Sequence, residues 1–399
     1  MKPINFLHVR FLLCLSIVWL GVSASATAQD FKTVRDGIEY AELTRTIAGQ
    51  PVRMNLLRLD LTKVRLDVVH AMDMAIGTET VSSMAKRHGA FAAINAGFFR
   101  LDKSIWAGDS AGILRIDGKL LSESHNERAA ILIKNYRRKT VVELTRLNIW
   151  MSLARQVGKR LFVERLDGID RERKSDEIVI YTPEFGKTTL TANGGIEIAV
   201  VNRKVTAVYD NTGNNQIPNN GYIISAIGKN VDRLRSYNLA DTVSYYFPQV
   251  CCGLSTSKWD SNDKTMFYED ITNGVPQLIK NGKIDITWEQ EKASKSFVET
   301  RHPRTAVAKL KDGKFLMVTV DGRSESSGGL GLSDLAALLL EFGATDAMNL
   351  DGGGSTTMFL DGKVVNTPSD REGERKVSDA IIVTLRNRST SKTPVTSRK

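Results

Sequence analysis

The 399-residue chain has the composition of a globular protein, with 42% hydrophobic and 25% charged residues. This is enough apolar material for a large core, and it excludes an intrinsically disordered chain. The formal net charge is +10, but the basic residues are spread along the chain instead of clustering with aromatic residues. That pattern argues against nucleic acid as a partner and suits an anionic glycan, a cell-wall polymer or a lipid surface.

The first 28 residues have the pattern of a cleavable export signal. Lys2 and Arg10 precede an apolar run at residues 11–22, and small residues follow as far as Ala28. We expect cleavage after Ala28, or alternatively after Ala26. The apolar run is shorter than the roughly 20 residues that span a bilayer. We therefore expect a secreted or periplasmic protein with no integral membrane segment, and losing Lys2 and Arg10 would lower its charge from +10 to +8.

Cys251 and Cys252 are the only cysteines after the expected signal. Because they are adjacent, they cannot close a long stabilising loop. Two buried thiols are one interpretation, and a vicinal disulfide or a reactive pair is the other. Their spacing is not that of a metal site.

Apolar alternation predicts strands through most of the chain. It predicts a strand pair at residues 52–69, a strand at 91–95 and, in the last third, strands that begin near Arg304 or end at Asp321 and Asp351. Short Asp-Gly or Asn-Gly turns before lysine predict hairpins. They lie at residues 117–119, 281–283, 312–314 and 361–363.

Helices are expected to be few. Thr80 and Ser333 are typical N-caps, so we expect one helix over residues 80–88 and a buried one that ends before Gly343. A short helix is also expected at 231–239. Residues 140–176 are charged and weakly periodic, which we interpret as a helical or loop excursion.

These elements predict an α+β fold, with a mixed, largely antiparallel sheet that has several hairpins and is packed by a few helices. We expect a signal peptide at residues 1–28, one domain at 29–388 and a disordered basic tail at 389–399.

Polar residues stand where several apolar strands begin or end. They are Asn95, Arg304, Asp321 with Arg323, and Asp351. If these strands share one sheet, the side chains converge at its rim. Asp351 is also followed by three glycines, which form either a simple tight turn or a site where a ligand approaches bare backbone. For Asn95, a side-chain cap on the turn is the alternative to a ligand contact.

Five motifs, in order along the chain, resemble those of the phosphodiester glycosidase family. They are AINAGFF at 93–99, NGVPQLI at 273–279, HPRTA at 302–306, VDGR at 320–323 and NLDGGGS at 349–355. The resemblance runs from about Asp36 to Arg386 and implies a single α+β catalytic domain that hydrolyses a sugar-1-phosphodiester. It implies catalytic roles for four residues and places Gly352 and Gly353 along the site. The four are Asn95, Arg304, Asp321 and Asp351.

The residue types fit that chemistry. A phosphate leaving group needs little protonation, so the usual pair of carboxyl groups is less necessary. A guanidinium such as Arg304 can bind phosphate oxygens, and backbone N–H groups of the glycine turn can add donors. A carboxylate is then needed to activate water, attack the sugar carbon or stabilise positive charge. We expect Asp351 in this role, with Asp321 as the second choice.

Further residues complete the predicted substrate-binding set. They are Gly352, Gly353, Gly354, Ser355, Arg323 and His302. His302 before proline is alternatively structural, and Arg323 alternatively pairs with Asp321. No cofactor is expected, although Glu325 with Asp321 and Asp351 could hold a divalent cation.

The expected function is that of an exported hydrolase, a glycosidase that releases a sugar and a phosphomonoester. Its expected substrate is a phosphate-bearing glycan or glycolipid, not nucleic acid. Two alternatives remain open from the sequence: a non-catalytic protein that binds or processes exopolysaccharide, and a metal-dependent phosphodiesterase.

Overall fold

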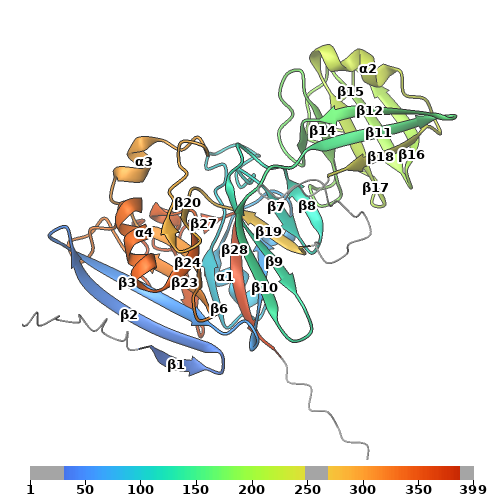
Figure 1. Ribbon diagram of the computed structural model, residues 1–399. Helices are drawn as coiled ribbons and strands as arrows, with labels where there is room; N and C mark the ends of the chain where they lie inside the picture. Colours follow the sequence, from blue (N-terminus) through green and yellow to red (C-terminus); the bar gives the residue numbers. More distant parts are fainter. Residues whose placement is uncertain (1–30, 248–267, 387–399) are drawn as a thin grey trace, which may run out of the picture. The chain divides into compact units, whose positions relative to one another are not determined.

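The computed structural model describes residues 31–247 and 268–386 (Figure 1). The expected export signal, the Cys251–Cys252 pair and the expected basic tail lie outside these residues. Strands make up 46% of the structure and helices 11%, in mostly antiparallel sheets. The predicted fold class is therefore confirmed.

The first eight-stranded sheet contains Arg304 and leads directly into the segments of Asp321 and Asp351, and its strands pair in antiparallel fashion. Its order is β1 (Lys32–Arg35), β2 (Ile38–Ile47), β3 (Gln50–Leu59), β23 (Phe315–Val320), β22 (Arg304–Leu310), β24 (Ala344–Asn349), β20 (Gln277–Lys280) and β21 (Lys283–Ile284). Strand β22 lies between β23 and β24, so it is a central strand. Its exposed fraction is near zero over most of its length because both faces of the sheet are covered.

Helix α4 (Leu332–Glu341) packs on one face of this sheet, where Leu335 and Leu339 join a core cluster with Val318. The helix begins earlier than predicted. Its N-cap is Gly331, and Ser333 lies in the first turn, because Leu332 is fully buried and starts the apolar face of the helix. Helix α3 (Lys295–Glu299) contributes to the same cluster.

Two five-stranded sheets cover the other face through a second core cluster, to which Met317, Leu66 and Ile131 belong. One is β26 (Lys363–Val364), β25 (Met358–Leu360), β6 (Ala92–Asn95), β28 (Asp379–Leu385) and β4 (Val64–His70). The other is β10 (Thr140–Arg146), β9 (Ala129–Asn135), β19 (Asp270–Asn273), β7 (Leu114–Ile116) and β8 (Lys119–Ser122). Helix α1 (Val81–Arg87) packs beside β6, and Thr80 is its N-cap as predicted, accepting a hydrogen bond from Ser83 N–H.

A second eight-stranded sheet occupies residues 151–246 and is drawn in green to yellow in Figure 1. Its order is β12 (Arg160–Leu166), β11 (Met151–Val157), β18 (Thr242–Tyr246), β16 (Lys204–Asp210), β15 (Ile196–Val201), β17 (Gly221–Ala226), β14 (Ile178–Tyr181) and β13 (Gly168–Ile169). The prediction of a helical or loop excursion over residues 140–176 is therefore wrong. Strands β10, β11 and β12 fill much of it, and β12 is exposed on both faces, which removes the alternation that would have revealed it.

The remaining elements are short. They are α2 (Val231–Arg235), the two-stranded pair β5 (Glu79–Thr80) with β27 (Lys376–Val377), and the 3₁₀ turns Ala71–Asp73, Gly228–Asn230 and Gly353–Ser355. Helix α2 ends before the predicted residue 239. In the described part of the chain, no helix is long and apolar enough to cross a membrane.

The turns predict at least three hairpins, and the structure has a hairpin at all four of them. They join β7 to β8, β20 to β21, β22 to β23 and β25 to β26. Asp117, Asn281 and Asp361 have positive φ of 49°, 50° and 46°, and the glycine after each is also left-handed. Two consecutive positive φ angles give the turn whose twist matches the strands, which is why Asp-Gly and Asn-Gly are found there.

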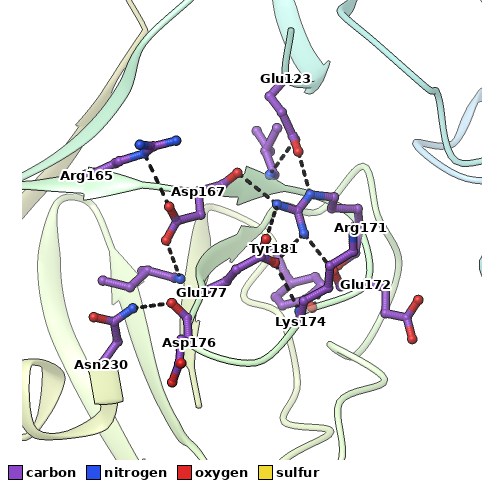
Figure 2. A network of polar contacts seen from close by, with 12 residues as sticks. Glu123, Arg165, Asp167, Arg171, Glu172, Lys174, Asp176, Glu177, Tyr181 and Asn230 are labelled. Carbon is purple, nitrogen blue, oxygen red and sulfur yellow. Dashed lines mark hydrogen bonds and ion pairs between the residues drawn. The ribbon is translucent and has the colours of Figure 1, made fainter. Parts of the chain in front are cut away.

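Arg171 connects the second eight-stranded sheet to the end of β8 (Figure 2). Its Nε donates to Glu123 Oε1 at 2.5 Å, its Nη1 to Glu177 Oε2 at 2.7 Å, and its Nη2 to the Asp167 carbonyl at 2.8 Å. The Tyr181 hydroxyl donates to the Arg171 carbonyl at 2.9 Å. The guanidinium is thus bound on three sides, and its side chain is 12% exposed.

Candidate functional site

Three of the predicted strand-end residues lie at one edge of the first sheet. Arg304 at the start of β22 pairs with Val320 at the end of β23, and Ala306 pairs with Asn349 at the end of β24. Because neighbouring antiparallel strands run in opposite directions, the start of β22 and the ends of β23 and β24 meet at the same edge. The structure therefore brings the segments of Arg304, Asp321 and Asp351 together.

Pro303 lies between the two glycine-containing turns of this edge. A methyl group on Gly322 would lie 2.8 Å from Pro303 N, and one on Gly352 would lie 2.7 Å from the Pro303 carbonyl oxygen. Gly353 N–H donates to that same oxygen at 2.9 Å. Both positions must be glycine for the three segments to pack this closely.

Two guanidinium groups lie against the other glycines of the turn. A methyl group on Gly353, whose φ is +61°, would lie 2.9 Å from Arg323 Nη2, and one on Gly354 would clash with Arg375 Nη2. Arg375 is held by both carboxylate oxygens of Asp370, at 2.7 and 3.0 Å. Because Gly353 and Gly354 have no side chain, the guanidinium groups of Arg323 and Arg375 can lie against the turn that follows Asp351.

The N–H groups of the turn are mostly used within the protein. Gly352 N–H donates to Asp351 Oδ1 at 2.9 Å, Gly353 N–H to Pro303, and Ser355 N–H to the Gly352 carbonyl at 3.1 Å. Our expectation that these N–H groups bind phosphate oxygens is therefore corrected for all three. Uncompensated positive charge beside the turn comes from Arg323 instead, because Arg375 is paired with Asp370.

Asp351 is fixed by its backbone and perturbed by its surroundings. Its N–H donates to the Ala96 carbonyl at 2.9 Å, and its own carbonyl accepts from Asn95 Nδ2 at 2.7 Å. Burial raises the pKa of the carboxyl group from 3.8 to about 6, although the Gly352 N–H and the charge of Arg375 act in the opposite direction. Such a group changes protonation near neutral pH, as a catalytic carboxyl group often does.

Asn95 is fully buried at the end of β6, and its side chain makes three hydrogen bonds to protein groups. Its Oδ1 accepts from the Thr305 hydroxyl at 2.7 Å and from Thr357 N–H at 3.1 Å. Its Nδ2 donates to the backbone carbonyl of Asp351. Asn95 thus positions the Asp351 turn relative to β22. Of the two interpretations from the sequence, its contacts are those of a structural cap.

Asp321 is 3% exposed and only half satisfied. Its Oδ1 accepts from Asn366 Nδ2 at 3.3 Å and Thr367 N–H at 3.1 Å. Its Oδ2 has no hydrogen-bond partner in the described part of the chain, and the nearest cation, Arg53 Nε, is 4.0 Å away. Burial raises the pKa of this carboxyl group. A buried carboxylate oxygen with unused acceptor capacity is suited to a ligand hydroxyl.

Arg304 is 1% exposed, which is unusual for an arginine. Nε donates to the Leu330 carbonyl at 2.9 Å, and Nη2 to the Phe297 and Thr300 carbonyls at 2.8 Å each. Among the described residues it has no carboxylate partner, and Nη1 makes no hydrogen bond. Burial lowers its pKa to about 10, so it remains a cation at neutral pH.

Arg323 adds to this positive region, and His302 precedes Pro303 at the same edge. Arg323 is exposed, has a φ of +62°, and donates to the Ser369 hydroxyl at 3.4 Å. It does not pair with Asp321, so that alternative is wrong. His302 is half-buried, and burial together with Arg304 and Arg323 lowers its pKa. Its backbone bridges to Leu330, so the residue also has the structural role considered from the sequence.

Sequence reasoning missed several polar residues next to this edge. Asp379 is fully buried at the start of β28 and accepts from Gly97 N–H at 2.9 Å and from the Thr272 hydroxyl at 2.5 Å. His70 ends β4 and faces it in register, and burial lowers the pKa of His70. Both stand at strand ends, so the criterion that selected Asn95 would have found them. Arg375 lies in a polar loop, where no pattern marks it.

The proposed cation ligands are not grouped. Among residues 31–247 and 268–386, no three His, Cys, Asp or Glu side chains are close enough to form a metal site. Glu325 is exposed on its loop.

Comparison with known proteins finds a family that matches the segment containing this edge of the sheet. Residues 194–384 match the family described as phosphodiester glycosidase. Through this segment, a little under half of its length, the chain is similar to that family. The phosphodiester glycosidase segment contains each predicted site residue except Asn95, which lies on β6, outside it.

Curated relatives match over shorter stretches. The N-acetylglucosamine-1-phosphodiester alpha-N-acetylglucosaminidase of Bos taurus is 36% identical over 112 residues, 26% of this chain and 21% of the relative. The uncharacterized prophage protein YomE of Bacillus subtilis is 40% identical over 86 residues, 22% of this chain and 13% of the relative. This chain thus covers about a fifth or less of the length of either relative.

Two solved structures share the fold over most of the chain. A Synechocystis protein superposes with a TM-score of 0.74 at 22% identity, covering 90% of this chain and 65% of the other. A Burkholderia pseudomallei protein, provisionally named an exported protein, superposes with a TM-score of 0.69 at 22% identity, covering 84% of this chain and 74% of the other. At this identity the likeness shows the fold.

Proposed function

We propose that the protein is a glycosidase that hydrolyses a sugar-1-phosphodiester and releases a free sugar and a phosphomonoester. The observation that carries the proposal is the glycine turn, where Asp351 lies beside the cations Arg323 and Arg375. Arg304 and Arg323 have no carboxylate partner among the described residues. Positive charge without a counter-ion is suited to an anionic substrate.

In this proposal the cations bind the phosphodiester and the carboxylates act on the sugar. Arg323 and the free Nη1 of Arg304 stabilise the phosphate oxygens as the leaving group gains negative charge. The ionised Asp351 activates water or attacks the sugar carbon. Asp321, whose Oδ2 has no hydrogen bond within the described residues, accepts a hydrogen bond from a sugar hydroxyl. Because phosphate leaves readily, no second carboxylic acid is needed to protonate it.

The match to the phosphodiester glycosidase family and the named bovine relative support this substrate class. We also propose that residues 29–388 form one catalytic domain and that the protein acts outside the cytoplasm, on a phosphate-bearing glycan or glycolipid. The signal-like N-terminus supports export, as does the provisional name of the similar Burkholderia protein.

The test is hydrolysis of N-acetylglucosamine-1-phosphodiesters and their glucose, galactose and mannose analogues in ¹⁸O-labelled water. Cleavage of the sugar C–O bond places the label in the free sugar, and this is the expected result. Sugar-1-phosphate with label on phosphorus would instead identify a phosphodiesterase that cuts the P–O bond. Assays with and without a chelator determine whether either reaction needs a divalent cation.

Variants separate catalysis from binding. We expect Asp351→Asn to lower kcat by about a hundredfold or more, while Asp361→Asn, in the β25–β26 turn, leaves it unchanged. Substrate binding with no turnover by the wild-type protein would favour the polysaccharide-binding alternative. Full activity of the Asp351→Asn protein would refute the assigned role of this carboxylate.

A further inference from the structure

One face of the second eight-stranded sheet exposes an unusual set of apolar side chains. On β12, Leu161 is 66% and Val163 63% exposed, and nearby Trp150 and Tyr246 are 62% and 52% exposed. On the opposite face of the same strands, Leu153 and Val243 are fully buried in a core cluster. The exposed face is thus apolar although it faces solvent.

Strand register shows that these side chains share a face. Leu161 and Val163 pair with Gln156 and Ala154 of β11, and Tyr246 of β18 pairs with Ser152. Paired residues and alternate residues of a strand point to the same side. Trp150 joins them, because the Arg165 guanidinium lies over its ring at 5.7 Å and Arg165 also pairs with Ser152. We call the four residues Trp150, Leu161, Val163 and Tyr246 the outer face.

Cations surround the outer face. In the segments 150–166 and 203–208, Glu164 is the only carboxylate. The same two segments contain six basic residues, Arg155, Lys159, Arg160, Arg165, Arg203 and Lys204. Arg155 is buried near Asp241, and Arg165 forms an ion pair with Asp167 at 3.3 Å, whereas the other four are exposed and have no ion pair among the described residues. The outer face is therefore an apolar surface with a basic border.

We propose that the outer face docks the protein on an anionic lipid bilayer. Tryptophan and tyrosine favour the interface between water and lipid, and exposed aliphatic side chains gain free energy by entering the acyl region. Lysine and arginine at the border are attracted to anionic headgroups. Leu161 and Val163 are the observation that favours lipid over a polysaccharide, because they offer no aromatic ring on which a sugar could stack.

The edge position of β12 is compatible with this role. In the sheet order it has a partner on one side only, β11. A long apolar edge strand is an aggregation hazard unless it is charged or covered. Lys159 and Arg160 charge its start, and a bilayer would cover its apolar residues.

The experiment is co-sedimentation of the mature protein with vesicles, in the absence of substrate. We expect the protein to pellet with vesicles of equal parts phosphatidylglycerol and phosphatidylcholine, and much less with phosphatidylcholine alone. High salt should weaken the interaction, because exposed charges are screened. Brominated lipids should quench tryptophan fluorescence in the wild type and less in the Trp150→Phe variant.

Matched double variants test the surface. Leu161→Glu with Val163→Glu should weaken vesicle binding by about tenfold or more. The control is Leu101→Glu with Ile105→Glu, two residues outside this sheet that are 62% and 65% exposed. It makes the same chemical change and should alter binding by less than about twofold. Thermal unfolding verifies that both proteins fold.

Several results would overturn the proposal. Failure to pellet with any vesicle would do so, as would equal losses in both double variants. A dimer that the Leu161→Glu, Val163→Glu change dissociates, without vesicle binding, would identify a second copy of the chain as the occupant. Binding to a polysaccharide gel that requires Trp150, again without vesicle binding, would identify a glycan surface. None of these results depends on whether the protein hydrolyses a sugar phosphodiester.

Discussion

Asp351 ionises against an unfavourable environment. Its carboxyl group has a pKa of about 6 in the folded protein and an ordinary value of 3.8. Well below pH 3.8 the group is protonated in both the folded and the unfolded state, so it has no effect on stability. As the pH rises from about 4 to 6, the unfolded state releases its proton more easily, and the folded state loses stability.

We therefore expect Asp351→Asn to become progressively more stable relative to the wild type as the pH rises from 4 to 6. The gain should level off above pH 7, at no more than about 3 kcal/mol. Urea unfolding of both proteins at a series of pH values measures it. The wild-type kcat/KM should also fall as the pH drops through 6, because the proposed mechanism requires the ionised carboxylate of Asp351. Parallel stability profiles for the two proteins would show that Asp351 does not titrate in this range.

The candidate site was predictable from the sequence where a polar residue follows an apolar strand. That criterion gave Asn95, Arg304, Asp321 and Asp351, three of which the structure places on segments that meet at one sheet edge. It did not reveal hydrogen-bond partners, because those depend on contacts between residues far apart in the chain. The same pattern could not distinguish Asn95, whose side-chain oxygen and nitrogen are both hydrogen-bonded within the protein, from Asp321, whose Oδ2 has no hydrogen-bond partner among the described residues.

At the scale of elements, one amide group connects β6, β22 and the glycine turn. Asn95 accepts hydrogen bonds from Thr305 and Thr357 and donates to the Asp351 carbonyl. All of these groups except Asp351 are fully buried or nearly so, and no water can replace a lost partner without entering the core.

Asn95→Ala should lower the free energy of unfolding by about 3 kcal/mol, because two donors and one acceptor lose their partner. Thr305→Val removes one hydroxyl while keeping the shape, so it should cost about 1 kcal/mol. Chemical denaturation of both variants measures the difference. Equal costs would mean that the amide does not connect the three elements.

Local turn chemistry made the hairpins predictable. Strands whose side chains are exposed on both faces could not be predicted from the sequence pattern. The Asp-Gly and Asn-Gly turns have backbone preferences that do not depend on the rest of the fold. Strand β12 has exposed residues on both faces, and its sequence therefore alternates in neither polarity nor size. Its identity as a strand depends on pairing with β11, which no single-sequence pattern records.

At the scale of the whole molecule, Arg171 joins segments that lie in different sheets. It binds Glu123 after β8 and also Glu177 and the Asp167 carbonyl beside the second eight-stranded sheet (Figure 2). Arg165 lies in the same region, but its side chain is 73% exposed and its ion pair with Asp167 measures 3.3 Å. Substituting each arginine therefore compares the stability contributed by a partly buried ion-pair network with that of an exposed ion pair.

Arg171→Met should destabilise the protein by about 3 kcal/mol, because it leaves two partly buried carboxylates without a cation. Arg165→Met should cost less than about 0.5 kcal/mol, since exposed ion pairs contribute little. Urea unfolding gives both values, and hydrogen exchange should show that residues 168–184 open first in the Arg171 variant. Similar losses in the two variants would show that Arg171 does not connect the sheets.

The uncompensated guanidinium groups of Arg304 and Arg323 also affect how a reaction cycle would end. A phosphodiester carries one negative charge, whereas the phosphomonoester left after hydrolysis carries up to two near neutral pH. Arg304 and Arg323 have no competing carboxylate among the described residues, so they would hold the leaving product more tightly than the substrate it came from. Departure of the phosphomonoester, and not bond cleavage, would then limit turnover.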